Sequence, residues 1–468
     1  MLLSRFTLIA IAALFAGCMG MPDRPVLPEI DEDAEFAAPI VVETRKAGGA
    51  WWHRAVDAKT SELIKHLLAT SPSLREAEQR VAVAEARLAQ AQADQGGSAS
   101  LDASAATQDN GADTTKSARL GVDASVPIDV NGALAQRRLA AEGRLDAARA
   151  DFQARRTELA RDFLLALIDY YEARERGRLL NEQLAVADTL LRLIELRFTQ
   201  GLASSVDVLQ QRDQRAALRQ QLPIAERDRW TANNTLRRLA GKSPGAETVA
   251  AGKPLPEISD AFAIVEPLLL INTRPDLRAS AARVAAADAA FAAALADRLP
   301  SMTLSGSALR RVVAGDYTTL LSAALDAAFT LFDGGNTRAV AAERRAELGA
   351  LGERYLIDWL DAVFEVDNLL FERVSLRERL DLSSQRLISA QQLLDAAQRR
   401  YERGVSDYLP VLEALRGLQQ QQRDHLSLRA ELGRTRVRLH NALGDSPATI
   451  PNRTSLQRSN KALLEVTG

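Results

Sequence analysis

The longest pattern of apolar positions runs through residues 133–199, and residues 336–402 repeat it. In the later half of the first run, apolar residues are spaced alternately four and three apart: Leu180, Leu184, Ala187, Leu191, Ile194 and Phe198. This spacing forms the seam of a helix that packs lengthwise on its neighbours with a left-handed supercoil. The run holds no proline, so we predict one unbroken helix of roughly 100 Å, at about 1.5 Å per residue.

The chain is duplicated at a constant offset. A shift of 203 residues relates Pro72 to Pro275, Gly132 to Gly335, Arg197 to Arg400, Gly201 to Gly404, Val208 to Val411 and Gly241 to Gly444. A constant offset over so much chain indicates a tandem duplication without net insertion. We therefore expect two repeats, at 51–244 and 275–447, that lie side by side, with a linker at 245–274 and a tail at 448–468.

Each repeat follows the same order of elements. The expected segments are short helices at 73–95 and 276–298, strands at 98–107, 117–127, 301–310 and 319–331, long helices at 133–199 and 336–402, and return helices at 205–240 and 408–443. Alternating apolar and polar residues indicate the strands. Ser204 and Asp207 predict a capping box for the first return helix and Asp407 a cap for the second, whereas Pro223 predicts a kink.

The helix lengths predict how the elements are stacked. A short helix and a return helix together match one long helix in length, so we expect them end to end beside it. Segments 40–70, 242–275 and 445–468 would then form a belt around the middle, with the hairpins at one end and the glycine turns at the other. Four strands cannot close into a barrel, so several chains must combine, and three would give twelve strands around a water-filled lumen. Only Tyr317 and Phe329 are candidates for the aromatic girdles of such a barrel.

The N-terminus is typical of a secreted lipoprotein. Arg5 precedes an apolar run too short to span a bilayer, so we predict a signal peptide at 1–17. Cys18 is the only cysteine and follows Ala-Gly, which predicts a lipidated mature N-terminus. The alternative is a cysteine that merely lies within a cleaved signal. Residues 18–50, rich in proline and acids, are expected to form an extended tether.

Composition and motifs argue against several classes of function. A formal net charge of −2 leaves no basic footprint for nucleic acid. The four histidines, His53, His66, His425 and His440, lack metal-ligand spacing. The sequence contains no phosphate loop, nucleophile elbow or paired catalytic carboxylates, so we predict no catalytic site, cofactor or metal site.

A doubled motif carries a family resemblance. Arg197-Phe198-Thr199-Gln200-Gly201 followed by Val208-Leu209 recurs as Arg400-Tyr401-Glu402-Arg403-Gly404 followed by Val411-Leu412. With Cys18, Trp51-Trp52, the hairpins and the duplication, it resembles the TolC-like outer membrane efflux proteins, in the lipoprotein subgroup of OprM, CusC and NodT. The resemblance implies a homotrimer with a twelve-stranded outer-membrane barrel and a periplasmic α-helical tunnel. It further implies docking to a periplasmic adaptor and an inner-membrane pump such as an RND transporter.

The candidate site residues lie at the expected helix tips. The resemblance assigns adaptor docking to Gly201, Val208, Leu209, Gly404, Val411 and Leu412, and a periplasmic gate to Asp207, Tyr401, Asp407 and Glu413. Each has a structural alternative. The glycines serve equally as helix C-caps, the acids as helix caps, and the apolar residues and Tyr401 as packing within the tip.

Three functions are open at this point. The main hypothesis is a passive exit duct of a tripartite efflux system, driven by its inner-membrane partner. A type I protein-secretion duct would use the same fold. A periplasmic coiled-coil scaffold or adaptor, held by lipid alone, is the alternative from another class. Adaptors carry lipoyl-like and β-barrel domains between their helices, and no such extra strands are visible in the sequence.

Overall fold

The computed structural model describes residues 23–38, 50–109, 111, 114–247, 256–262, 266–313 and 316–444. The elements in chain order are α2 (Trp52–Ala55), α3 (Ala58–Thr70), α4 (Pro72–Ala93), β1 (Ser98–Asp109), β2 (Thr114–Ile128), α5 (Ala133–Thr199), α6 (Ser205–Leu239), η1 (Pro267–Leu269), α7 (Leu270–Thr273), α8 (Pro275–Ala296), β3 (Ser301–Val313), β4 (Asp316–Ala328), α9 (Asn336–Glu402) and α10 (Leu409–Ala442). The signal peptide, Cys18 and the tail at 448–468 lie outside the described residues.

The two long helices, α5 and α9, have the bounds that the apolar pattern predicts. Both start from a glycine with positive φ, 75° at Gly132 and 91° at Gly335. An aspartate before each glycine accepts hydrogen bonds from the first turn. Asp129 accepts from the amide of Ala135 at 2.8 Å, and Asp333 accepts from the amide of Thr337 at 2.7 Å. These turns release the chain from the sheet directly into the helix.

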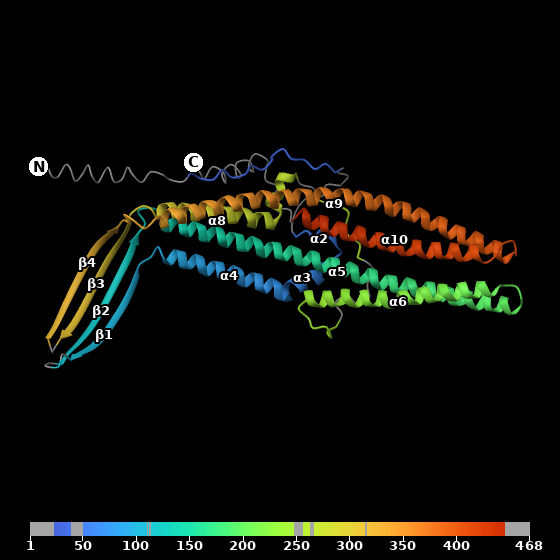
Figure 1. The fold of residues 1–468 in the computed structure, drawn as a ribbon, viewed down its shortest axis with the longest axis horizontal. Coiled ribbons are helices and arrows are strands. Elements are labelled where there is room, and N and C mark those ends of the chain that lie inside the picture. The colour runs from blue at the N-terminus through green and yellow to red at the C-terminus, as the bar shows by residue number, and fades with distance from the viewer. Residues whose placement is uncertain are drawn as a thin grey trace.

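Shorter helices line each long helix, and Figure 1 shows the resulting rods with the strands at one end. α4 and α6 pack along α5, while α8 and α10 pack along α9. α8 and α10 also contact α5, so the second repeat lies against the first. α6 continues unbroken through Pro223, where the sequence predicts a kink. The mainly α fold with a duplicated half is thereby confirmed.

The strands form one antiparallel sheet in the order β1-β2-β3-β4. Three strands are longer than predicted because the turns between them are short. β4 ends at Ala328 rather than at 331, since its last partner across the sheet is Ser301, where β3 begins. Residues that lie directly opposite share a face of the sheet. One face carries Leu101, Val122, Ala308 and Leu321, and the other carries serines, aspartates and arginines.

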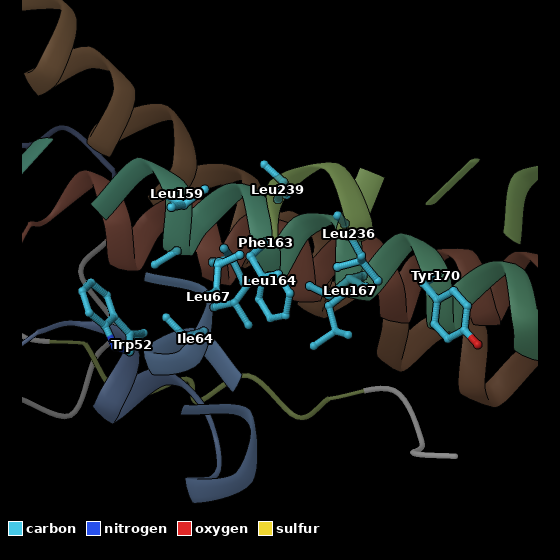
Figure 2. Close-up of a cluster of buried hydrophobic side chains, with 14 of the residues drawn as sticks. Trp52, Ile64, Leu67, Leu159, Phe163, Leu164, Leu167, Tyr170, Leu236 and Leu239 are labelled. Atoms are coloured by element: carbon cyan, nitrogen blue, oxygen red, sulfur yellow. The ribbon is translucent and has the colours of Figure 1, made fainter. Parts of the chain in front are cut away.

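A belt of short segments surrounds the middle of the rods. Figure 2 shows Trp52 and Ile64, from α2 and α3, on the side of α5 that carries Phe163. Leu236 of α6 belongs to the same buried cluster. The second repeat has a matching cluster in which α7 and Phe262 pack on the middle of α9. Of the segments expected in this belt, 50–70, 256–262 and α7 lie there, and 445–468 are outside the described residues.

The N-terminal segment 23–38 differs from the expected free tether. It is extended, but it lies bound along α8 and α9. Arg24 forms an ion pair of 2.8 Å with Asp288, and the amide of Ala38 donates to Asp367. A Cβ at Gly352 would lie 2.7 Å from the Leu27 side chain, so this glycine makes room for the segment.

Candidate functional site at the helix tips

The tip turns are helix C-caps built on glycine. Gly201 and Gly404 have φ of 73° and 72°. The amide of Leu202 donates to the carbonyl of Arg197 at 2.8 Å, as the amide of Val405 does to the carbonyl of Arg400 at 3.0 Å. A Cβ at either glycine would meet no atom within 4 Å. These positions therefore require glycine for backbone conformation alone.

The two return helices begin differently. At α6, the amide of Ser204 donates to the Asp207 carboxylate at 2.8 Å, and the amide of Asp207 donates to the Ser204 hydroxyl at 3.2 Å. This is the predicted capping box. The cap predicted from Asp407 is wrong: α10 starts from Tyr408, without a side-chain cap. Burial of the Tyr408 side chain fixes the start of α10 and leaves Asp407 exposed in the turn before it.

The predicted docking residues separate into two groups. Val208, Val411 and Leu412 are buried in a tip core that also contains Tyr401. Leu209, by contrast, is 61% exposed. The apolar side chains exposed at the tips include Phe198, Leu202, Val206, Leu209, Val405 and Leu409. The tip therefore has a packed interior and a separate apolar surface.

Tyr401 sits at the point where α5 meets the second repeat. The Arg197 guanidinium carbon lies 4.4 Å from its ring centroid, and the Tyr408 ring packs edge-on at 5.7 Å. The Tyr408 hydroxyl donates to Gln211 Oε1 at 2.6 Å. Burial is the main cause that raises the pKa of both tyrosines, so each stays a neutral hydroxyl at physiological pH. These contacts join α5 and α6 to α9 and α10 inside one chain.

The three candidate acids have different surroundings. The carboxylate of Asp207 is occupied as the α6 cap. Asp407 and Glu413 are exposed, and neither side chain has a recorded ion pair or hydrogen bond within the described part of the chain. Their charges consequently face solvent at the tip.

A ladder of glutamine side chains behind the tip was not predicted. Gln214 donates to Gln419 Oε1 at 2.8 Å, and Arg416 donates to Gln214 Oε1 at 2.7 Å. One level further from the tip, Arg423 donates to Gln183 Oε1 at 2.8 Å. The available signal was glutamine at buried heptad positions, where an apolar residue is usual. This ladder ties α6 and α5 to α10.

The described residues contain no group of three or more His, Cys, Asp or Glu side chains suited to a metal ion. His425 lies 3.3 Å from the Ser383 hydroxyl, and His440 is buried in the belt, 3.0 Å from the carbonyl of Ser259. The two histidines thus serve hydrogen bonding and packing.

Comparison with known proteins gives a consistent result. The family model described as outer membrane efflux protein matches residues 63–242 and 268–445. The pyoverdine export outer membrane protein OpmQ of Pseudomonas aeruginosa is 28% identical over 471 residues, covering 92% of this chain and 95% of that protein. The cation efflux system protein CusC of Escherichia coli K12 is 25% identical over 460 residues, covering 93% and 97%. The solved outer-membrane channel OprN superposes with a TM-score of 0.81 at 25% identity, over 90% of this chain and 99% of that one.

Proposed function

Since this chain belongs to the outer membrane efflux protein family, we propose that three copies form one exit duct, docked at its helix tips to a periplasmic adaptor and an inner-membrane pump. The protein is an outer-membrane efflux channel, with a barrel in the membrane and helices in the periplasm. Relatives include a pyoverdine export protein and a cation efflux protein. We accordingly propose small-molecule cargo rather than secreted protein.

The sheet supports assembly from several chains. β1 and β4 are its two edges, and an open edge in lipid would leave backbone groups without hydrogen-bond partners. Three copies supply twelve strands, enough to enclose a water-filled lumen. The apolar row of β2 runs from Ala118 to Ile128, which at about 3.4 Å per residue and a tilt near 40° gives a band roughly 26 Å tall. That height suits an outer membrane.

The main support for assembly into a trimer comes from a comparison of equivalent positions in the two repeats. Ile168 on α5 is fully buried because α10 covers it, with the Cβ position of Gly433 only 3.5 Å away. Its equivalent on α9, Phe371, is 64% exposed. The equivalent of Gly433 on α6, Trp230, is 61% exposed. If the geometry of the duplication continues around a ring, Trp230 of a second copy covers Phe371.

A cross-link tests this contact. We expect Phe371→Cys combined with Trp230→Cys to give covalent trimers on a denaturing gel after oxidation, since Cys18 is the only natural cysteine. The control combines Trp230→Cys with Ile388→Cys, an exposed α9 position about 25 Å away along the helix. Equal cross-linking of both pairs, or a monomer in detergent, would contradict the proposed assembly.

We further propose that the tip is the gate. Threefold symmetry would repeat Asp207, Asp407 and Glu413 around the axis, and such carboxylate rings favour cations. The contacts of Tyr401 with Arg197 and of Tyr408 with Gln211 would hold the helix pairs together in the closed tip.

Single-channel conductance tests the gate. Glu413→Ala and Asp207→Ala should raise conductance in planar bilayers. Asp207→Asn is the matched variant, because it removes the charge and keeps a capping side chain. Unchanged conductance in all three variants would remove these acids from the gate.

The exposed apolar residues of the tip are the proposed docking surface for the adaptor. Of the predicted docking residues, Leu209 would contact the adaptor directly. Gly201 and Gly404 would keep the tip compact, and Val208, Val411 and Leu412 would support it from inside. Lipidation of Cys18 remains a proposal. A Cys18→Ser protein that still needs detergent for extraction would favour the duct, and a water-soluble one would favour the lipid-held scaffold.

A further inference from the structure

Two arginines lie directly opposite each other in the membrane sheet. Arg119 of β2 pairs with Arg311 of β3 in the antiparallel register. Side chains alternate between the faces of a strand, so both arginines share the face that carries Asp123 and Ser307, which are also paired. This face is polar, and the opposite face carries the apolar band. In the proposed barrel the polar face lines the lumen.

The pair needs an explanation, because like charges placed directly opposite destabilise a sheet. Neither guanidinium has an ion pair or hydrogen bond recorded among the described residues. The neighbouring acids of the same face, Asp102 and Asp316, stand one level away on either side, opposite Gly121 and Val313. The arrangement leaves four guanidinium N–H edges free for a ligand in the lumen.

Arg310, the adjacent residue, provides the contrast. It lies opposite Leu120, on the apolar face. Its guanidinium carbon is 5.1 Å from the ring centroid of Tyr317, so this arginine has a partner in its own chain. An arginine and a tyrosine on the lipid-facing side suit the outer membrane–water interface. Neighbouring arginines thus stand at the same height on opposite sides of the wall.

We propose that Arg119 and Arg311 of three copies form an arginine collar that binds multivalent phosphate or carboxylate anions near the outer end of the lumen. The inference rests on the trimeric duct proposed above. Twelve strands about 4.8 Å apart and tilted by about 40° enclose a radius of roughly 12 Å. Arginine side chains reaching about 7 Å inward leave a passage roughly 10 Å wide, lined by planar groups that bind such anions bidentately.

The collar reverses the charge that a cargo meets on its way out. Travelling outward, the polar face presents Asp326, Asp123 and Asp102 before it presents the two arginines. Rings of acids favour cations and rings of arginine favour anions. Beyond the collar, Asp316 is the one charged residue of this face among the described residues, so each copy keeps a net positive charge at the outer end. The outer end of the duct therefore discriminates by charge in the opposite sense to the wall before it.

Planar-bilayer recordings of the purified protein test the collar, with sodium tripolyphosphate added on the side of the hairpin turns. We expect tripolyphosphate to reduce the wild-type current. The Arg119→Ser and Arg311→Ser double variant should need at least tenfold more of it for the same block, and its reversal potential in a KCl gradient should shift toward cation selectivity. Arg310→Ser, at the same height on the lipid side, should behave as wild type. Lysine at both collar positions should keep the selectivity and weaken the block.

The outcomes separate the two proposals. A wild-type protein that conducts but is not blocked, or a double variant blocked as wild type is, would overturn the collar and leave the duct intact. A response of Arg310→Ser equal to that of Arg311→Ser would also overturn it. A wild-type protein that forms no pore would refute the duct and the collar together. Should the double variant fail to assemble, each single serine variant still has to show intermediate block, and one equal to wild type would refute the collar.

Discussion

The two repeats have the same elements at the same offset, yet their surroundings differ. α10 packs against both α9 and α5, whereas the extensive contacts of α6 are with α5. Leu412 on α10 is consequently fully buried, and its equivalent Leu209 on α6 is 61% exposed. The same local sequence is interior in one repeat and surface in the other. Within one chain, α5 and α10 are therefore covered on both sides, whereas α6 and α9 each keep an uncovered side, as the exposed Trp230 and Phe371 show.

The parts of the repeats that lie nearer the sheet differ in another way. In the first repeat, Arg149 of α5 forms an ion pair of 3.1 Å with Glu85 of α4. The equivalent positions in the second repeat are Gly352 and Asp288. There Arg24 supplies the missing cation at 2.8 Å, and Leu27 fills the space above the glycine. The N-terminal segment thus replaces one side chain of the repeat and distinguishes the two halves.

The largest predicted loss of stability distinguishes two equivalent glycines next to the belt, Gly444 and Gly241. A Cβ at Gly444 would lie 2.3 Å from the carbonyl oxygen of Thr273, at a φ of 76°. At Gly241, its equivalent, the Cβ would instead meet the Pro72 ring at 2.6 Å. We expect Gly444→Ala to lower the free energy of unfolding by roughly 3–5 kcal/mol per chain, because backbone strain and overlap combine.

Thermal unfolding in detergent, followed by circular dichroism, measures this effect. Gly404→Ala is the control, since its φ is 72° with free space around it, and it should cost only about 1–2 kcal/mol. Gly241→Ala should fall between the two, because a proline ring moves more easily than a carbonyl. Equal losses at Gly404 and Gly444 would show that the close approach in the belt is unimportant.

The sequence predicts a helix correctly where residues within and next to that helix determine its ends. The heptad seam and the flanking glycines Gly132 and Gly201 place both ends of α5. The sequence does not predict structure correctly where contacts with a distant segment determine it. Burial of Tyr408, which depends on Gln211 in the other repeat, moves the start of α10 past Asp407. No periodicity indicates that residues 23–38 bind to α9, because the cause is the absence of a side chain at Gly352.

The sequence predicts where the candidate site lies, but it predicts only part of the contacts within the site. The doubled motif places the tips, but the identical Val-Leu pairs cannot show that Leu412 is buried and Leu209 exposed. That distinction depends on which helix pair lies inside the chain. The glutamine ladder was missed for the same reason, because its partners come from different repeats.

A second prediction concerns pH and the belt of the second repeat. His440 is buried between Trp51 and Phe262 and lies 3.0 Å from the carbonyl of Ser259, to which the neutral ring donates. Burial lowers its pKa from 6.5 to about 4; Arg54 and Arg436 add to the shift, and Asp260 opposes it. The equivalent position in the first repeat holds Arg237 instead of a histidine.

The lowered pKa of His440 determines how the free energy of unfolding changes with pH. Below pH 6.5 the unfolded chain binds a proton at His440, and the folded chain does not until about pH 4. The free energy of unfolding should therefore fall by about 3 kcal/mol per chain between these values and level off below. Thermal unfolding at a series of pH values measures it, and His440→Gln should remove this slope while keeping a hydrogen-bond donor. A slope that persists unchanged in His440→Gln would assign the effect to another group.

The smallest predicted change in free energy concerns the binding of the N-terminal segment, residues 23–38, to α8 and α9. Gly352→Arg gives the second repeat the arginine that the first repeat has at Arg149. The new side chain should occupy the space of Leu27 and pair with Asp288, and so displace Arg24. Loss of the Leu27 burial should cost the bound segment about 2 kcal/mol, without a comparable change in thermal stability. Limited proteolysis should then cleave residues 23–38 roughly tenfold or more faster. Arg149→Gly, which leaves the segment's own site intact, should cleave at the wild-type rate, and equal cleavage in both variants would mean that Gly352 does not select this half for the segment.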